Sequence, residues 1–77
     1  SGSDQRRKLM IAISVNGETT EVADGASVLD VARLCGVDGE RGVAIARAGE
    51  VVRRADWAGT ALAAGDRLEV VRATAGG

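Results

Sequence analysis

The fold of this chain is decided by residues 10–36, which read MIAISVNGETTEVADGASVLDVARLCG. Met10 to Val15 is a short apolar run rich in β-branched residues, and it predicts a strand. Asn16-Gly17 follows directly and is the strongest short-range signal for a hairpin turn. A returning strand over Thr19 to Ala23 is therefore predicted, and Asp24-Gly25 ends it.

A helix is predicted to follow this hairpin. Ser27 can cap the first turn, and Asp30 three residues later completes a capping-box pattern. Gly36 is expected to end the helix, and a polar loop over residues 37–41 comes next. The apolar positions that recur at helical spacing are Val28, Leu29, Ala32 and either Leu34 or Cys35.

Three more strands are predicted, over residues 42–47, 51–53 and 67–72, with an irregular segment over 54–61. The order β-β-α-β-β-β predicts an α+β, ubiquitin-like β-grasp fold: a mixed four- to five-stranded sheet with one main helix packed on one face. We expect residues 10–72 to form this domain. Residues 1–9 are interpreted as a tag or disordered N-terminal extension, and residues 73–77 as a flexible tail ending in Gly-Gly.

The composition argues against several classes of function. A net charge of −1 and a single aromatic residue offer little to nucleic acid, which needs phosphate neutralisation and base stacking. No run approaches the roughly 20 apolar residues of a membrane span, and no signal-peptide pattern is visible. The single cysteine permits no internal disulfide, which fits a reducing compartment. We therefore expect a soluble, cytoplasmic protein that binds neither nucleic acid nor membrane.

Residues suited to catalysis or metal binding are scarce. The sequence has no His, which removes the usual general base, and one Cys without His gives no zinc or iron–sulfur site. Cys35 lies near the end of the predicted helix, where the helix dipole does not favour a thiolate, so it is interpreted as a small packed residue. We expect no catalytic residue, no metal and no bound cofactor.

Trp57 and the late arginines each have two interpretations. Trp57 either covers one edge of an aliphatic core or contacts a partner. The arginines are either a solvated surface or a cluster that meets an acidic partner. They are Arg53, Arg54, Arg67 and Arg72.

The sequence ends on Ala73-Thr74-Ala75-Gly76-Gly77, directly after the last predicted strand. Two glycines without Cβ atoms make a thin thread, and residues 73–77 can extend over about 15–18 Å. That length can carry a carboxylate into the active site of another protein. The terminal carboxylate of Gly77 is unhindered, so ATP can activate it as an acyl-adenylate that a sulfur or nitrogen nucleophile then attacks. The possible partner contacts are Trp57, Arg72 and Ala75.

From Met10 to Gly77 the sequence resembles the ThiS-like sulfur carriers of thiamine biosynthesis. Members often carry Asn where Ala48 stands and Pro where Arg53 stands. The segments that match are Asn16-Gly17, Ser27-Val28-Leu29, Val43-Ala44-Ile45-Ala46, Val51-Val52, Arg54 before Asp56-Trp57, Gly65-Asp66 and Ala75-Gly76-Gly77.

The resemblance implies a protein co-substrate rather than an enzyme. An E1-like adenylating enzyme (ThiF- or MoeB-like) would use its own ATP and Mg²⁺ to adenylate Gly77. A persulfide donor would then supply sulfur, so that Gly77 bears a thiocarboxylate with Gly76 as its slender spacer. A thiazole synthase (ThiG-like) would accept that sulfur. The implied carrier is a monomer when free and docks through the sheet face near its last strand.

Other functions stay open at this point. They are the small subunit of molybdopterin synthase, a sulfur carrier for cysteine or thio-tRNA synthesis, a ubiquitin-like protein modifier, and a binding module with an inert tail.

Overall fold

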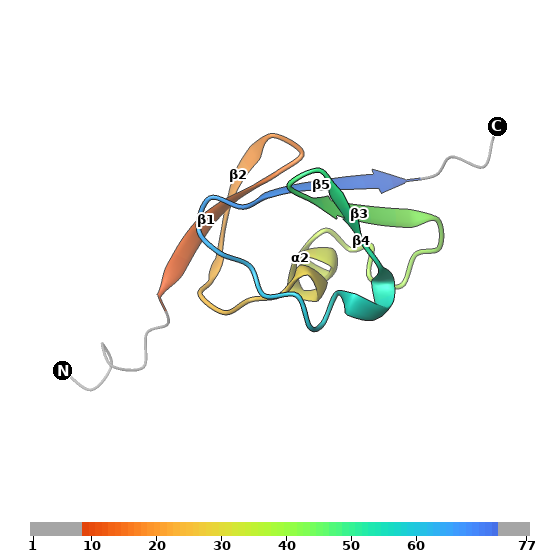
Figure 1. Ribbon diagram of the computed structural model, residues 1–77, viewed down its shortest axis with the longest axis horizontal. Coiled ribbons are helices and arrows are strands. Elements are labelled where there is room, and N and C mark those ends of the chain that lie inside the picture. The colour runs from red at the N-terminus through yellow and green to blue at the C-terminus, as the bar shows by residue number, and fades with distance from the viewer. Residues whose placement is uncertain (1–8, 73–77) are drawn as a thin grey trace.

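An antiparallel hairpin begins the sheet in the computed structural model, which describes residues 9–72 (Figure 1). Strand β1 (Met10–Val15) pairs with β2 (Glu18–Ala23), and the turn between them holds Asn16 and Gly17. Their φ angles of 54° and 84° are those of a type I′ turn, whose twist matches the flanking strands. The predicted hairpin is confirmed, and β2 begins one residue earlier than expected.

Helix α2 (Val28–Leu34) begins at a complete capping box. The Asp30 N–H donates to the Ser27 hydroxyl, and the Ser27 N–H donates to the Asp30 carboxylate over 2.9 Å. Two N–H groups that the first turn leaves unpaired are thereby satisfied. The predicted helix start is confirmed.

The helix ends in a Schellman motif. The Val37 N–H donates to the Ala32 carbonyl over 2.9 Å, and the Gly36 N–H donates to the Arg33 carbonyl over 3.1 Å. Gly36 has a φ of 74°, which glycine adopts without a Cβ clash. This reversal returns Val37 to the core, where it is 1% exposed. The prediction of a polar loop from residue 37 is therefore wrong at Val37.

The helix face differs from the prediction at its C-terminal end. The buried helix residues are Val28, Val31 and Ala32, with Leu29 partly buried. Leu34 is 66% exposed and Cys35 is exposed, because the chain turns at Cys35, the C-cap, and Val37 fills the core instead. The interpretation of Cys35 as a packed residue is wrong.

The sheet has five strands in the order β2-β1-β5-β3-β4. The later strands are β3 (Val43–Arg47), β4 (Glu50–Val52) and β5 (Arg67–Arg72), and a 3₁₀-helix, η1 (Arg54–Asp56), follows β4. Strands β1 and β5 are parallel neighbours, and the other pairs are antiparallel. The predicted α+β fold with a mixed sheet is confirmed.

The core lies between the sheet and α2. Figure 1 shows α2 and the connection from β4 to β5 on the same side of the sheet, so no helix or loop of residues 9–72 covers the opposite face. The core side chains are aliphatic apart from Trp57. They are Ile13, Val15, Val22, Ala26, Val28, Val31, Ala32, Val37, Ile45, Trp57, Leu62 and Leu68.

Candidate functional site

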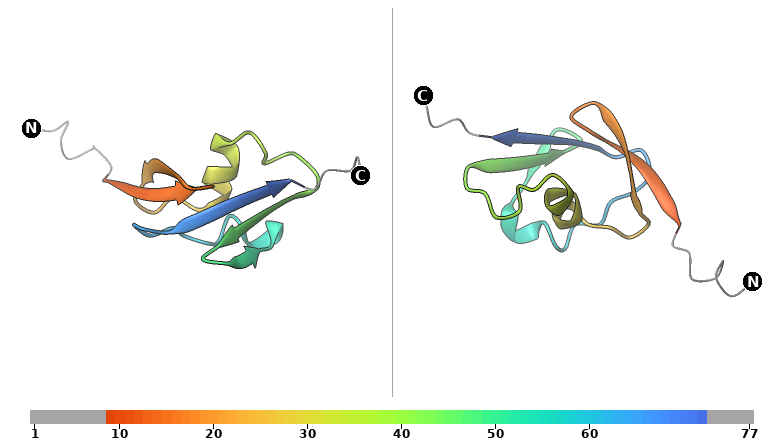
Figure 2. Two further views of the ribbon diagram at one scale, coloured as in Figure 1. Left: turned by 90° about the horizontal axis from the view of Figure 1, so that it is seen from above. Right: turned by 180° about the vertical axis from the view of Figure 1, so that it is seen from behind.

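The described part of the chain ends on β5, at Arg72. Gly77, the spacer Gly76 and the possible contact Ala75 lie outside the described residues. Strand β5 lies in the middle of the sheet, between β1 and β3 (Figure 2). Pairing with β1 reaches Leu68, and pairing with β3 continues to Arg72. The end of β5 is therefore held in register by β3.

Arg72 is held at the end of β5 by two neighbours. It lies opposite Val43, the first residue of β3, in the antiparallel register. Its Nε lies 3.4 Å from the Glu40 carboxylate, and these side chains are 59% and 46% exposed. A pair so exposed contributes only about 0–1 kcal/mol. It connects Arg72 to the loop before β3.

Arg54 holds the same loop from the other side. Its guanidinium donates to the Asp38 carbonyl over 2.6 Å and to the Glu40 carbonyl. The guanidinium carbon also lies 4.5 Å from the centre of the Trp57 ring. A cation over an aromatic face contributes about 0.5–1 kcal/mol at an exposed site. A continuous set of contacts thus connects Trp57, through Arg54 and Glu40, to Arg72.

Trp57 belongs to the core. The side chain is 1% exposed, and its Nε1–H donates to the Val52 carbonyl over 2.9 Å. The one polar atom of the ring is therefore satisfied, as buried indoles require. In this conformation the ring offers no surface to a partner, and Arg54 is the group that lies over it.

Asn16 supports β5 in a way that the sequence analysis missed. Its Oδ1 accepts a hydrogen bond from the Val70 N–H over 2.8 Å. The pairing of β1 with β5 extends only to Val15 opposite Leu68, so Val70 lies beyond the end of β1. The Asn side chain replaces the missing strand partner. The signal in the sequence was Asn16 itself. A type I′ turn accepts Asp or Gly at this position as well, so the turn alone does not account for Asn.

An apolar patch lies on the open face of the sheet beside β5. Val71 lies opposite Ala44 and Val51 opposite Ala46, while their neighbours Ile45, Val52 and Val70 face the core. Val51 and Val71 are 68% and 57% exposed. Exposed apolar groups gathered on one surface are typical of an interaction site. The open-face patch consists of Ala44, Ala46, Val51 and Val71.

The four late arginines do not share one role. Arg54 and Arg72 meet at the loop over residues 38–40, whereas no contact within residues 9–72 brings Arg53 or Arg67 to it. The described residues hold no cluster of His, Cys, Asp and Glu that could bind a metal ion. The contacts of Arg54 and Arg72 thus define a surface at the end of β5.

None of the helices in the described part of the chain is long and apolar enough to cross a membrane.

A mixed five-stranded sheet with one helix across a single face, and the last strand in its middle, defines a protein of the ubiquitin-like β-grasp class. The model of the ThiS family matches residues 9–77. The chain therefore belongs to the ThiS family, which places it among the sulfur carriers of thiamine biosynthesis.

A solved structure gives the same result. The chain is similar to the thiamine biosynthesis protein ThiS from Geobacter metallireducens, whose crystal structure matches with a TM-score of 0.73 and 26% sequence identity. The match covers 87% of this chain and 100% of that chain. No curated protein matches this sequence. The resemblance inferred from the sequence is confirmed at the level of fold and family.

Proposed function

We propose that this protein carries sulfur on the C-terminal carboxylate of Gly77 and delivers it to the thiazole of thiamine. The family match carries this proposal, because it runs through Gly76 and Gly77 to the last residue of the sequence. The fold supports it, since β5 is a fixed central strand that ends five residues before Gly77. The chain is a co-substrate on which partner enzymes act.

The reaction begins with activation. The Gly77 carboxylate attacks the α-phosphate of ATP, forms an acyl-adenylate and releases pyrophosphate. The terminal sulfur of a cysteine persulfide then displaces AMP and forms an acyl persulfide. A thiol attacks the donor's cysteine sulfur, forms a disulfide with it and releases the thiocarboxylate. An E1-like adenylating enzyme (ThiF-like) holds the ATP and Mg²⁺. A thiazole synthase (ThiG-like) accepts the sulfur. Glycine suits this role because its carbonyl carbon is unhindered.

The open-face patch is the surface that we assign to the activating enzyme. It lies on β5 and its neighbours, so a partner docked there is close to the start of the tail. Its exposed apolar groups are two valines opposite two alanines, and Glu69 lies on the same face opposite Ala46. A small patch of this kind suits transient complexes, which bury less surface than permanent ones. A carrier must leave one enzyme before it meets the next.

Intact-mass analysis tests the proposal. We expect co-expression with a ThiF-like enzyme and a cysteine desulfurase to replace one oxygen by sulfur, and fragmentation to locate the sulfur at Gly77. A chain lacking Gly76 and Gly77 serves as the matched control. It should keep its unfolding free energy within about 0.5 kcal/mol and gain no sulfur.

Two results would contradict the proposal. A ladder of larger conjugates through Gly77 would identify a protein modifier. Sulfur on Gly77 together with rescue of a molybdenum-cofactor mutant, and no rescue of a thiamine-requiring strain, would assign a different acceptor pathway.

A further inference from the structure

Strand β2 forms one edge of the sheet, and one side of its backbone meets no other strand within residues 9–72. The Asp24 N–H donates to the Leu9 carbonyl over 2.7 Å. Along β2 the backbone N–H and carbonyl groups of successive residues point alternately toward and away from β1, and this bond shows which residues point toward it. The peptide groups of Thr19, Glu21 and Ala23 consequently face away from β1. Of these, the Ala23 carbonyl accepts the Ala26 N–H over 2.9 Å. The other outward N–H and carbonyl groups can pair with an added strand.

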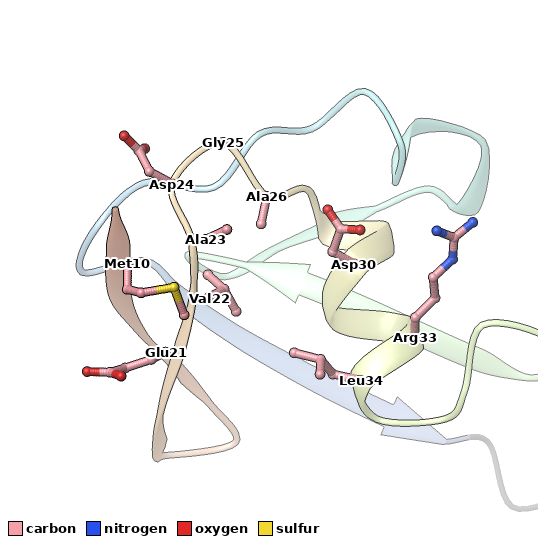
Figure 3. A pocket seen from close by; sticks show the side chains of 10 residues that line it. All are labelled: Met10, Glu21, Val22, Ala23, Asp24, Gly25, Ala26, Asp30, Arg33 and Leu34. Atoms are coloured by element: carbon pink, nitrogen blue, oxygen red, sulfur yellow. The ribbon is translucent and has the colours of Figure 1, made fainter. Parts of the chain in front are cut away.

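A groove of about 590 Å³ follows this edge between β2 and α2 (Figure 3). Figure 3 shows Leu34 reaching from α2 toward β2. Leu34 is 66% exposed, and Met10, on the other face of the edge, is 55% exposed. Successive side chains of a strand point to opposite faces, so an added strand would contact Leu34 and Met10 in turn. The smaller apolar groups of the groove are Val22, Ala23 and Ala26.

The rim of the groove is acidic. The carboxylates of Glu21, Asp24 and Asp30 line it, against the single guanidinium of Arg33. Asp30 is already engaged by the Ser27 N–H over 2.9 Å. Glu21 and Asp24 form no ion pair within the described residues. A strand with basic side chains would complement these charges.

A second copy of this chain fits the edge poorly. The outward-facing residues centre on Glu21, so antiparallel self-pairing about a two-fold axis would place Glu21 opposite Glu21 and Glu18 opposite Asp24. Like charges directly opposite each other destabilise a strand pair. Charged side chains on an edge are a known defence against such self-association.

We propose that β2 and this groove bind an extended segment of a partner protein in which apolar and basic residues alternate. The segment adds a sixth strand by hydrogen bonding to the backbone of Thr19, Glu21 and Ala23. Its apolar side chains contact Leu34, and its basic side chains lie beside Glu21 with their aliphatic stems over Met10. The end of β5 points away from β2 (Figure 1), and no residue of β5 lines the groove, so this surface is separate from the sulfur-transfer site that we propose.

A titration followed by nuclear magnetic resonance tests this surface on the full, isotope-labelled chain. The probe is the peptide Lys-Val-Lys-Val-Lys-Val-Lys, and its counterpart with Glu in place of Lys is the control. We expect the Lys peptide to shift signals of residues 19–25 and 30–34 and the Glu peptide to shift none. Glu21→Lys and Leu34→Ser should each weaken binding about fivefold.

The other edge strand, β4, supplies matched control variants. Glu50 is exposed, and Val51 is 68% exposed, close to the 66% of Leu34. Glu50→Lys and Val51→Ser should leave peptide affinity unchanged. Three results would overturn the proposal: an equal loss of peptide affinity in these β4 variants, peptide-induced signal shifts confined to β4, or binding of the Glu peptide as tight as that of the Lys peptide.

A further experiment tests whether the basic residues of the chain itself, Arg6, Arg7 and Lys8, occupy the groove. Their joint replacement by Gln should leave the β2 signals unchanged when no peptide is present. The proposal would be overturned if the β2 signals shifted in that variant and adding the Lys peptide shifted no signals. The groove would then be assigned to residues 6–8 of the same chain. A concentration-dependent dimer that protects the β2 amides would assign it to a second copy, with the same consequence.

Discussion

Arg54 lies over Trp57, with its guanidinium carbon 4.5 Å from the centre of the indole ring. The ring is buried and the guanidinium is exposed, so the stack joins the core to the surface. The same guanidinium donates to two carbonyls of the loop before β3, at Asp38 and Glu40. Arginine suits this position because its planar guanidinium can stack on an aromatic ring and donate two hydrogen bonds at the same time, which a lysine ammonium cannot do.

Replacing Arg54 should destabilise the protein. We expect Arg54→Ala to lower the free energy of unfolding by about 1–2 kcal/mol, since it removes the stack and leaves two carbonyls without their donor. Arg54→Lys should recover only part of this loss. Urea unfolding gives the values, and Arg53→Ala, at the exposed neighbouring residue, is the control. Equal stability of the Arg54→Ala and Arg53→Ala variants would show that the contacts contribute nothing.

The single Trp reports directly on its own burial. Trp57 is 1% exposed, so its emission should lie at short wavelength in the native protein and move to long wavelength on unfolding. Acrylamide should quench it several-fold less in the native protein than in urea, because a close-packed core excludes the quencher. Quenching in the native state at the rate of the unfolded chain would place Trp57 at the surface.

Ala48 holds a conformation that suits it poorly. Its φ of 53° lies in the left-handed region, at the first position of the turn between β3 and β4, with Gly49 at 87°. A Cβ costs about 1 kcal/mol there, and Asn tolerates the region better than Ala. We expect Ala48→Asn to raise the free energy of unfolding by about 0.5–1 kcal/mol. Ala64→Asn, at an exposed position with no positive φ, should change it little, and an equal gain there would remove the explanation.

The local signals in the sequence were sufficient for most elements. Asn16-Gly17 fixed the first hairpin, and Ser27 with Asp30 fixed the helix start, because each rests on contacts between residues at most three apart. The burial of Val37 was not predicted, although a Gly that ends a helix often brings the apolar residue directly after it back to the core.

The site was harder to predict because its contacts join distant residues. Arg54 and Asp38 are 16 positions apart, and Asn16 and Val70 are 54 apart. No periodicity connects such pairs, since they depend on which strands become neighbours. The sequence pattern likewise did not show that β5 lies beside β1, so the central position of β5 in the sheet emerged only from the structure.

The hydrogen bond from Val70 to Asn16 can be separated from the turn that contains Asn16. Glycine adopts a type I′ turn readily, so Asn16→Gly keeps the hairpin and removes the acceptor of the Val70 N–H. We expect a loss of about 1 kcal/mol in unfolding free energy and faster hydrogen exchange at the Val70 amide. Unchanged exchange at Val70, with the hairpin amides still protected, would show that this bond does not hold β5.

The open-face patch should control recognition by the activating enzyme and leave its chemistry unchanged. Val71 is 57% exposed and lies beside Ala44, so Val71→Asp puts a carboxylate into the patch at little cost to folding. If the patch is the docking surface, the KM of a ThiF-like enzyme for this chain should rise about tenfold with kcat nearly constant, because a contact made equally in ground and transition states affects binding alone. Leu34→Asp adds the same charge at a residue of similar exposure on α2 and should leave KM unchanged. A parallel rise in both variants would trace the effect to net charge, and an unchanged KM for Val71→Asp would place the docking surface elsewhere.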